Sequence, residues 1–130
     1  MDFRNSIQSE FLLFEKAFST TLSSDNPLID NVLDYIHTKR GKQLRPILVL
    51  LSAAICRGIT SKTLQTAVVL ELTHTASLVH DDVVDNSPTR RGNNSVQQQW
   101  SNKVAILTGD YMLAKVISLL SELRNANLLN

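Results

Sequence analysis

The longest uninterrupted stretch of helix-compatible sequence, residues 64–85, most constrains what this chain can fold into. It contains no glycine or proline, and Thr60 or Ser61 precedes it as a candidate N-cap. A helix of this length is about 35 Å long. Residues 67–72 are apolar on nearly every side except at Glu71, which predicts a helix buried on most of its faces. A helix of this kind lies in the interior of the protein, with other parts of the chain packed around it.

The remaining sequence predicts further helices and no confident strand. Four Gly and three Pro in 130 residues are few, which favours long helices over a turn-rich β fold. Pro27 begins one helix, with Asn26 or Asp25 as its cap, and Pro46 opens another. The predicted helices cover residues 1–20, 27–41, 46–57, 61–85 and 104–123, and a loop at Asn86, Pro88 and Gly92 separates the last two.

Composition excludes several classes of protein. The chain has the length of one ordinary domain, and its net charge of +1 leaves no broad basic field for nucleic acid. Cys56 is the only cysteine, which excludes an internal disulfide framework and a cysteine-rich zinc site. The apolar stretch at residues 47–56 is too short to span a membrane, which needs about 20 residues. We therefore expect no membrane span, no signal peptide and a cytoplasmic location.

Three carboxylates, Asp81, Asp82 and Asp85, cluster in the last turn of the long predicted helix. They are neighbours on one face, they repel one another, and the helix dipole disfavours anions at this end. The cluster therefore needs a counter-charge. Arg90 and Arg91 can fold back as a salt-bridge network, or a divalent cation such as Mg²⁺ can be held together with substrate phosphates.

A basic pair, Lys42 and Arg45, lies at the mouth of the third predicted helix. Helix N-termini favour anions, and both side-chain types suit phosphate. The alternative is an ordinary solvated helix start. His74 lies two turns before Asp81 on the same helix stripe. A lone histidine on a buried helix is more often a core residue, but its alignment with the carboxylates favours a substrate role.

These motifs resemble those of one family, the trans-prenyl diphosphate synthases. Residues 74–85, followed by Arg90 and Arg91, resemble the family's first aspartate-rich region, and the Gly41-Lys42-x-x-Arg45-Pro46 stretch is similar to its isopentenyl diphosphate motif. The Gly109-Asp110 pair also matches. The likeness is greatest to long-chain members such as octaprenyl diphosphate synthases. It implies an all-α, antiparallel helix bundle of the isoprenoid synthase type, with residues 1–130 as the N-terminal part of a single domain.

The resemblance also implies an activity: Mg²⁺-dependent condensation of isopentenyl diphosphate with an allylic diphosphate to a long-chain polyprenyl diphosphate, in a homodimer. The implied roles are metal binding for Asp81 and Asp85, a supporting catalytic role for Asp82, allylic diphosphate binding for Arg90, and isopentenyl diphosphate binding for Lys42, Arg45, His74 and Arg91. Ala76 and Ser77, both small, imply an open tunnel and a long product, although Ala76 can also be small merely for helix packing.

Two departures from the family pattern qualify this reading. Arg40 stands where many relatives have a second glycine, which we interpret as a mild change in a loop. The family's second aspartate-rich motif is absent, so we expect the 130-residue chain alone to be inactive. Two alternatives remain. One is a non-catalytic helical module that dimerises with or regulates a partner, and the other is a terpene cyclase or squalene-type synthase, which does not require the Gly-Lys-x-x-Arg-Pro motif.

Overall fold

The computed structural model describes residues 5–125 and confirms the all-α prediction. A 3₁₀ turn at Asn5–Ile7 precedes the first helix. The α-helices are α1 (Gln8–Thr21), α2 (Pro27–Thr38), α3 (Leu44–Cys56), α4 (Ser61–Val84), α5 (Val96–Gln99) and α6 (Asn102–Asn125). Two short strands, β1 (Thr89–Arg90) and β2 (Asn93–Asn94), lie between α4 and α5.

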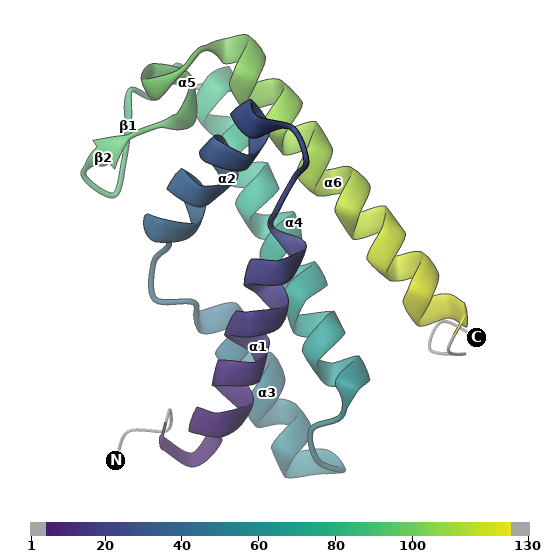
Figure 1. The fold of residues 1–130 in the computed structure, drawn as a ribbon. Helices are drawn as coiled ribbons and strands as arrows, with labels where there is room; N and C mark the ends of the chain where they lie inside the picture. The colour runs from purple at the N-terminus through teal and green to yellow at the C-terminus, as the bar shows by residue number, and fades with distance from the viewer. Residues whose placement is uncertain (1–4, 126–130) are drawn as a thin grey trace.

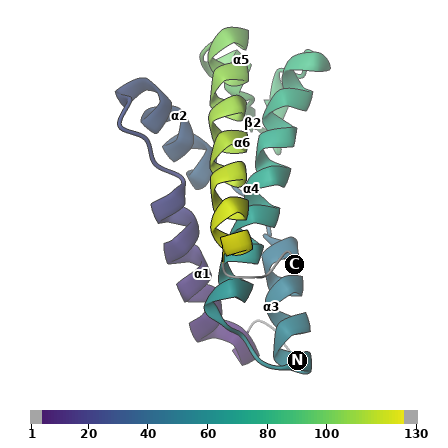
Figure 2. The same cartoon turned by 90° about the vertical axis from the view of Figure 1, so that its right-hand side faces the viewer.

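The long helix α4 is the central element of the bundle (Figure 1). Helix α6 runs antiparallel to it, and their contact is the most extensive between any two elements. Helices α1 and α3 also pack on α4, as the turned view shows (Figure 2). The prediction of a helix with several neighbours is therefore confirmed for residues 61–84.

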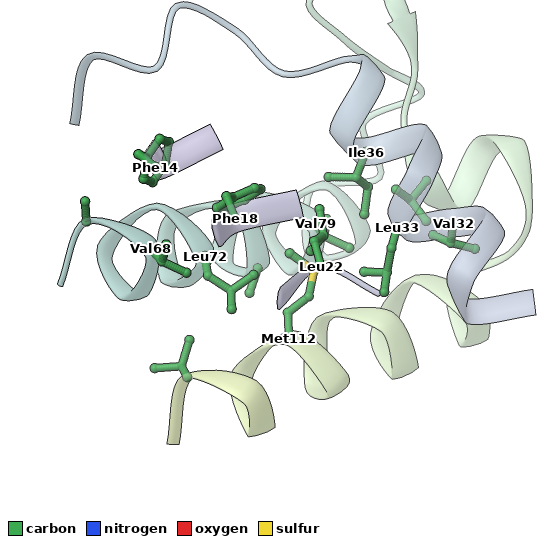
Figure 3. Packing of buried hydrophobic residues seen from close by; sticks show 14 of the residues in the cluster. Phe14, Phe18, Leu22, Val32, Leu33, Ile36, Val68, Leu72, Val79 and Met112 are labelled. Carbon is green, nitrogen blue, oxygen red and sulfur yellow. The ribbon is translucent and has the colours of Figure 1, made fainter. Parts of the chain in front are cut away.

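The core lies between α4 and the helices that surround it (Figure 3). Phe14 and Phe18 from α1, Leu33 from α2, Leu72 from α4 and Met112 from α6 are each less than 2% exposed. Burying side chains of this size stabilises the fold by roughly 1.5–3 kcal/mol each. This packing holds α4 in place, and α4 in turn carries most of the candidate site residues.

Two predicted helix caps are confirmed. The Thr60 hydroxyl accepts a hydrogen bond from the Thr63 backbone N–H, and the Thr63 hydroxyl accepts one from the Thr60 N–H. This reciprocal pair is a capping box, and it fixes where α4 begins. Before α2, the Asn26 side chain accepts hydrogen bonds from the backbone N–H groups of Leu28 and Ile29.

Helix α3 begins two residues earlier than the sequence predicts, at Leu44 rather than Pro46. Gln43 adopts a left-handed conformation (φ +58°) and turns the chain into the helix directly before Leu44. Pro46 then occupies the third helical position, where its missing N–H removes no bond within the helix.

The segment between α4 and α6 differs from the prediction of a plain loop. It forms a β-hairpin in which Thr89 pairs with Asn94 and Arg90 with Asn93, followed by the short helix α5. Arg91 and Gly92 make the turn with positive φ angles of +53° and +80°. Positive φ at both central residues is typical of a tight two-residue hairpin turn. Strands of two residues are too short to show an alternating hydrophobic pattern, which is why these two strands were not predicted.

Helix α6 is the one helix in residues 5–125 that is long and apolar enough to cross a membrane by length and composition alone. Its stretch Asn102–Arg124 has a mean hydropathy of 1.5. The expectation that the chain has no membrane span was based on residues 47–56 and did not consider this helix, so it stays a prediction. In the fold, α6 packs along α4 through buried residues that include Ala105, Thr108, Met112 and Val116.

Candidate functional site

A pocket of about 400 Å³ lies where the loop before α3, the start of α3, the C-terminal half of α4 and the β-hairpin meet. A concave site of this size suits a small-molecule ligand. It brings together all five residues that the sequence assigns to substrate binding, namely Lys42, Arg45, His74, Arg90 and Arg91. These residues come from positions up to 49 residues apart in the chain, so the fold rather than local sequence creates the site.

Helix α4 supplies one wall of the pocket. Glu71, His74, Leu78 and Asp82 follow each other at intervals of three or four residues and all line it. This spacing keeps side chains on one face of a helix. Asp82 is 4% exposed and Glu71 is 6% exposed, so the pocket has a buried carboxylate at each end of this wall.

The pocket is strongly basic. Six of its lining side chains are lysine or arginine, against two carboxylates: the basic residues are Lys39, Arg40, Lys42, Arg45, Arg90 and Arg91. Arg90 pairs with Asp82, and Arg40 pairs with Glu15. Arg45 and Arg91 form no ion pair with any residue from 5 to 125. The arrangement therefore leaves positive charge available for an anion.

Arg90 and Asp82 form a two-point ion pair. Arg90 donates from Nε to Oδ2 of Asp82 over 2.8 Å and from Nη2 to Oδ1 over 2.7 Å. The hydrogen bond to Asp82 raises the pKa of the Arg90 guanidinium above its ordinary value. The salt-bridge alternative therefore holds for Asp82. The ion pair anchors Arg90 and ties the β-hairpin to the end of α4.

Arg91 reaches the pocket by lying directly over Gly41. A Cβ atom at Gly41 would be 1.0 Å from Nη1 of Arg91, so only glycine leaves room for this guanidinium. Arg91 also keeps a left-handed backbone (φ +53°), which is uncommon for a non-glycine residue. Its place in the turn of the hairpin directs its side chain back across the loop before α3.

The N-terminus of α3 also contributes to the pocket. Gln43 at the N-cap makes no capping hydrogen bond through its side chain, and the first turn carries no acidic residue. Leu44 and Arg45, whose backbone N–H groups open the helix, both line the pocket. Uncapped N–H groups and the positive end of the helix dipole favour phosphate-like anions. The substrate role expected for Lys42 and Arg45 stays a prediction.

His74 lies in the same electrostatic environment. Burial lowers the pKa of its imidazole below the ordinary value of 6.5, and the nearby Arg45, Arg91 and Arg90 lower it further. The neutral ring is therefore favoured near neutral pH, with one nitrogen as donor and the other as acceptor. A neutral histidine can donate a hydrogen bond to an anion without adding repulsion among the arginines.

Asp81 and Asp85 lie outside the pocket, on the exposed side of α4. They are one helical turn apart and form no ion pair with any residue that the structure describes. No group of three or more His, Cys, Asp or Glu side chains that could hold a metal occurs among residues 5–125. Mg²⁺ is commonly held by one or two carboxylates with water and substrate phosphates. Asp81 and Asp85 fit that donor set, with a phosphate ligand completing it.

The two residues assigned to product length face different surroundings. Ala76 is 0% exposed and belongs to the hydrophobic core, whereas Ser77 is exposed and donates a hydrogen bond from its hydroxyl to the His74 carbonyl oxygen. Neither lines the pocket. The packing role considered for Ala76 is thus present in this structure, and its effect on product length stays a prediction.

Sequence reasoning overlooked three features near the site. Arg40, interpreted as a mild loop change, has a side chain that is 6% exposed, pairs with Glu15 over 2.7 Å and lies 4.3 Å from the centre of the Phe18 ring. Glu71, noted only as an interruption of an apolar run, is a pocket carboxylate. A charged residue inside an apolar helical run was the available signal for Glu71, because such groups are rarely buried without a partner.

The third feature explains the Gly109-Asp110 pair. A Cβ at Gly109 would be 2.2 Å from Nε2 of His80, so glycine lets α6 approach α4 closely. Nε2 of His80 also lies 3.2 Å from the Ile106 carbonyl oxygen and 3.4 Å from Oδ1 of Asp110. A glycine inside a helix costs about 1 kcal/mol relative to alanine, which was the signal for a close contact here.

Fold and pocket together define an all-α protein with a basic pocket beside two exposed carboxylates on a central helix. The chain belongs to the polyprenyl synthetase family, whose model matches residues 26–130. It is 43% identical over 101 residues to a decaprenyl-diphosphate synthase of Dictyostelium discoideum, covering 77% of this chain and 22% of that protein. The chain thus spans about a fifth of that relative's length.

Solved structures show the same relationship. A decaprenyl diphosphate synthase from Rhodobacter capsulatus superposes with a TM-score of 0.88 and 31% identity, over 96% of this chain and 39% of that one. A polyprenyl synthase from Caulobacter crescentus CB15, complexed with calcium and isoprenyl diphosphate, gives a TM-score of 0.87 and 26% identity, over 94% and 37%. The predicted family, fold and likeness to long-chain members are confirmed.

Proposed function

We propose that the basic pocket binds the diphosphate group of isopentenyl diphosphate, as one substrate site of a long-chain polyprenyl diphosphate synthase. The observation that carries this proposal is the convergence of Lys42, Arg45, His74 and Arg91 on one pocket, into which the uncapped N-terminus of α3 also opens. Arginine forks and helix N–H groups suit phosphate oxygens. The pocket also has apolar lining, including Leu78 and Val79, which suits a short hydrocarbon tail.

Asp81 and Asp85 are proposed to hold Mg²⁺ together with an allylic diphosphate. When bound, the metal would neutralise charge on the diphosphate leaving group. Asp82 supports this end of α4 by anchoring Arg90 through two hydrogen bonds. Two separate anion sites on neighbouring faces of α4 fit a reaction that joins two diphosphate substrates.

Calorimetric titration tests the substrate site directly. Isopentenyl diphosphate should bind the 130-residue chain, and isopentenol, which lacks the diphosphate, should not. The Lys42→Ala and Arg45→Ala variants should each bind it on the order of tenfold more weakly, because each loses a charge-assisted hydrogen bond. Equal binding of the alcohol and the diphosphate, or unchanged affinity in both variants, would contradict the proposal.

Radiolabelled condensation assays address the catalytic proposals. We expect no turnover by the 130-residue chain, because Asp81 and Asp85 supply only one of the two metal-binding motifs that the family resemblance implies. In a protein of the length of its relatives, Asp81→Asn should reduce turnover by more than tenfold with isopentenyl diphosphate affinity retained. Turnover by the short chain would overturn the first expectation. The homodimer and the cytoplasmic location remain proposals, and sedimentation of the longer protein tests the former.

A further inference from the structure

Glu71 is the charged group in the pocket that the proposed function does not use. It lies on the α4 wall, one turn before His74, and is 6% exposed. Its Oε2 atom is buried and accepts no hydrogen bond from any residue in 5–125. A buried carboxylate without a partner costs free energy, so its position in an anion-binding pocket calls for a physical reason.

The charges around Glu71 come from four segments of the chain. Arg40 precedes α3, Arg45 lies in its first turn, Arg91 is on the hairpin, and Glu15 is on α1. Burial raises the pKa of the Glu71 carboxyl above its ordinary value of 4.5, and the three arginines offset this only in part. Glu15 raises it further.

The three arginines differ in whether they have an ion-pair partner of their own. Arg40 pairs with Glu15, although its buried Nε and Nη1 atoms make no hydrogen bond with any described residue. Arg45 and Arg91 have no ion pair with a residue that the structure describes. Glu71 therefore supplies negative charge near two guanidinium groups that are otherwise uncompensated when the pocket is empty.

We propose that Glu71 is the counter-charge of the empty pocket, and that a bound diphosphate takes over this role, so that the Glu71 carboxylate takes up a proton from solvent when the anion binds. This inference rests on the proposed function. The physical reason is that an anion near Arg45 and Arg91 compensates their charge and repels the ionised carboxylate. Glu71 thereby sets the anion affinity of the pocket and makes it depend on pH.

His74 is the pocket side chain whose ordinary pKa lies nearest neutral pH, so it is the alternative source of proton uptake. The Glu71→Gln and His74→Gln variants distinguish proton uptake by Glu71 from proton uptake by His74. Both substitutions keep the approximate side-chain size. Glu122→Gln on the exposed surface of α6 is the matched control for removing a carboxylate.

Calorimetric titration of sulfate into the 130-residue chain measures the proton uptake. Sulfate stays fully ionised near neutral pH, so any proton exchanged belongs to the protein. Titrations at one pH, in two buffers of different ionisation enthalpy, give the net number of protons bound. The wild-type chain and Glu122→Gln should take up protons when sulfate binds. His74→Gln should keep the part of this uptake that belongs to Glu71, and Glu71→Gln should lose that part. Glu71→Gln should also bind sulfate about tenfold more tightly, because the repulsion is gone.

Three results would overturn the inference: no proton uptake by the wild-type chain, no uptake in His74→Gln, or weaker anion binding by Glu71→Gln. If Glu71→Gln does not fold, the uptake that persists in His74→Gln still decides the question. A parallel titration with inorganic pyrophosphate separates the two proposals. Anion binding with no proton uptake in the sulfate titration contradicts the role of Glu71 alone, whereas no binding of either anion contradicts the pocket assignment as well.

Discussion

The close contact between Gly41 and Arg91 predicts that one methyl group will weaken anion binding without weakening the fold. In Gly41→Ala, the new Cβ would be 1.0 Å from Nη1 and 2.2 Å from Cζ of Arg91, so the guanidinium must leave its position. Losing one charge-assisted hydrogen bond costs about 1.5–3 kcal/mol, which corresponds to roughly 10- to 100-fold weaker pyrophosphate binding. The fold should be unaffected, because the displaced atoms are the end of a flexible side chain.

A double-mutant cycle with calorimetry and thermal unfolding measures this effect. Arg91→Ala should lose similar affinity, and adding Gly41→Ala to it should cause no further loss, because the two substitutions remove the same contact. Gly58→Ala is the control. Gly58 has a φ of +96°, so an alanine there should lower the stability of the fold. A Cβ at this position would have no atom of the described residues within 4 Å, so the affinity for pyrophosphate should be unchanged. Wild-type affinity in Gly41→Ala, or additive losses in the double variant, would refute the reasoning.

Three other outcomes are expected. Asp82→Asn should lower the free energy of unfolding by about 2 kcal/mol, because it leaves the Arg90 guanidinium without its buried partner, and equal melting temperatures would contradict this. Arg91→Gly should raise the melting temperature slightly by relieving the left-handed backbone while weakening pyrophosphate binding, so a gain in affinity would count against it. Because the pKa of His74 is lowered in the folded chain, the unfolded chain takes up a proton near pH 6.5 before the folded chain does, so wild-type stability should fall as the pH drops below about 6.5. Denaturant unfolding of His74→Gln should show a smaller fall in stability over the same pH range. Parallel curves of stability against pH for the two proteins would contradict this.

Helix periodicity predicted most of the fold because α4 and its neighbours carry strong local signals. Thr60 and Asn26 are caps whose side chains act within three residues, so they are readable in sequence. The hairpin was missed because its strands are two residues long and its turn places Arg91 in a conformation that arginine seldom adopts. Its position depends on contacts with distant residues, such as the hydrogen bond from the Tyr35 hydroxyl to the Asn94 carbonyl oxygen.

The sequence was sufficient to identify which residue types belong to the candidate site. It was not sufficient to predict which of these residues are buried or ion-paired, because packing decides that. Lys42, Arg45 and His74 were identified from their types and spacing, and the pocket brings them together. That Asp82 is buried and paired while Asp81 is exposed could not be read from adjacent positions, because the two differ only in which helix face meets the hairpin. The environment of Glu71 likewise depends on three segments that converge only in the fold.

The central claim is that the start of α3, the α4 wall and the hairpin form one diphosphate site. Nuclear magnetic resonance of the isotopically labelled chain, titrated with inorganic pyrophosphate, tests it most directly. The backbone amides of residues 41–45, 74 and 90–94 should shift together and saturate with a single dissociation constant. Shifts that do not saturate, that follow different dissociation constants in the three segments, or that leave the start of α3 unaffected would contradict the claim.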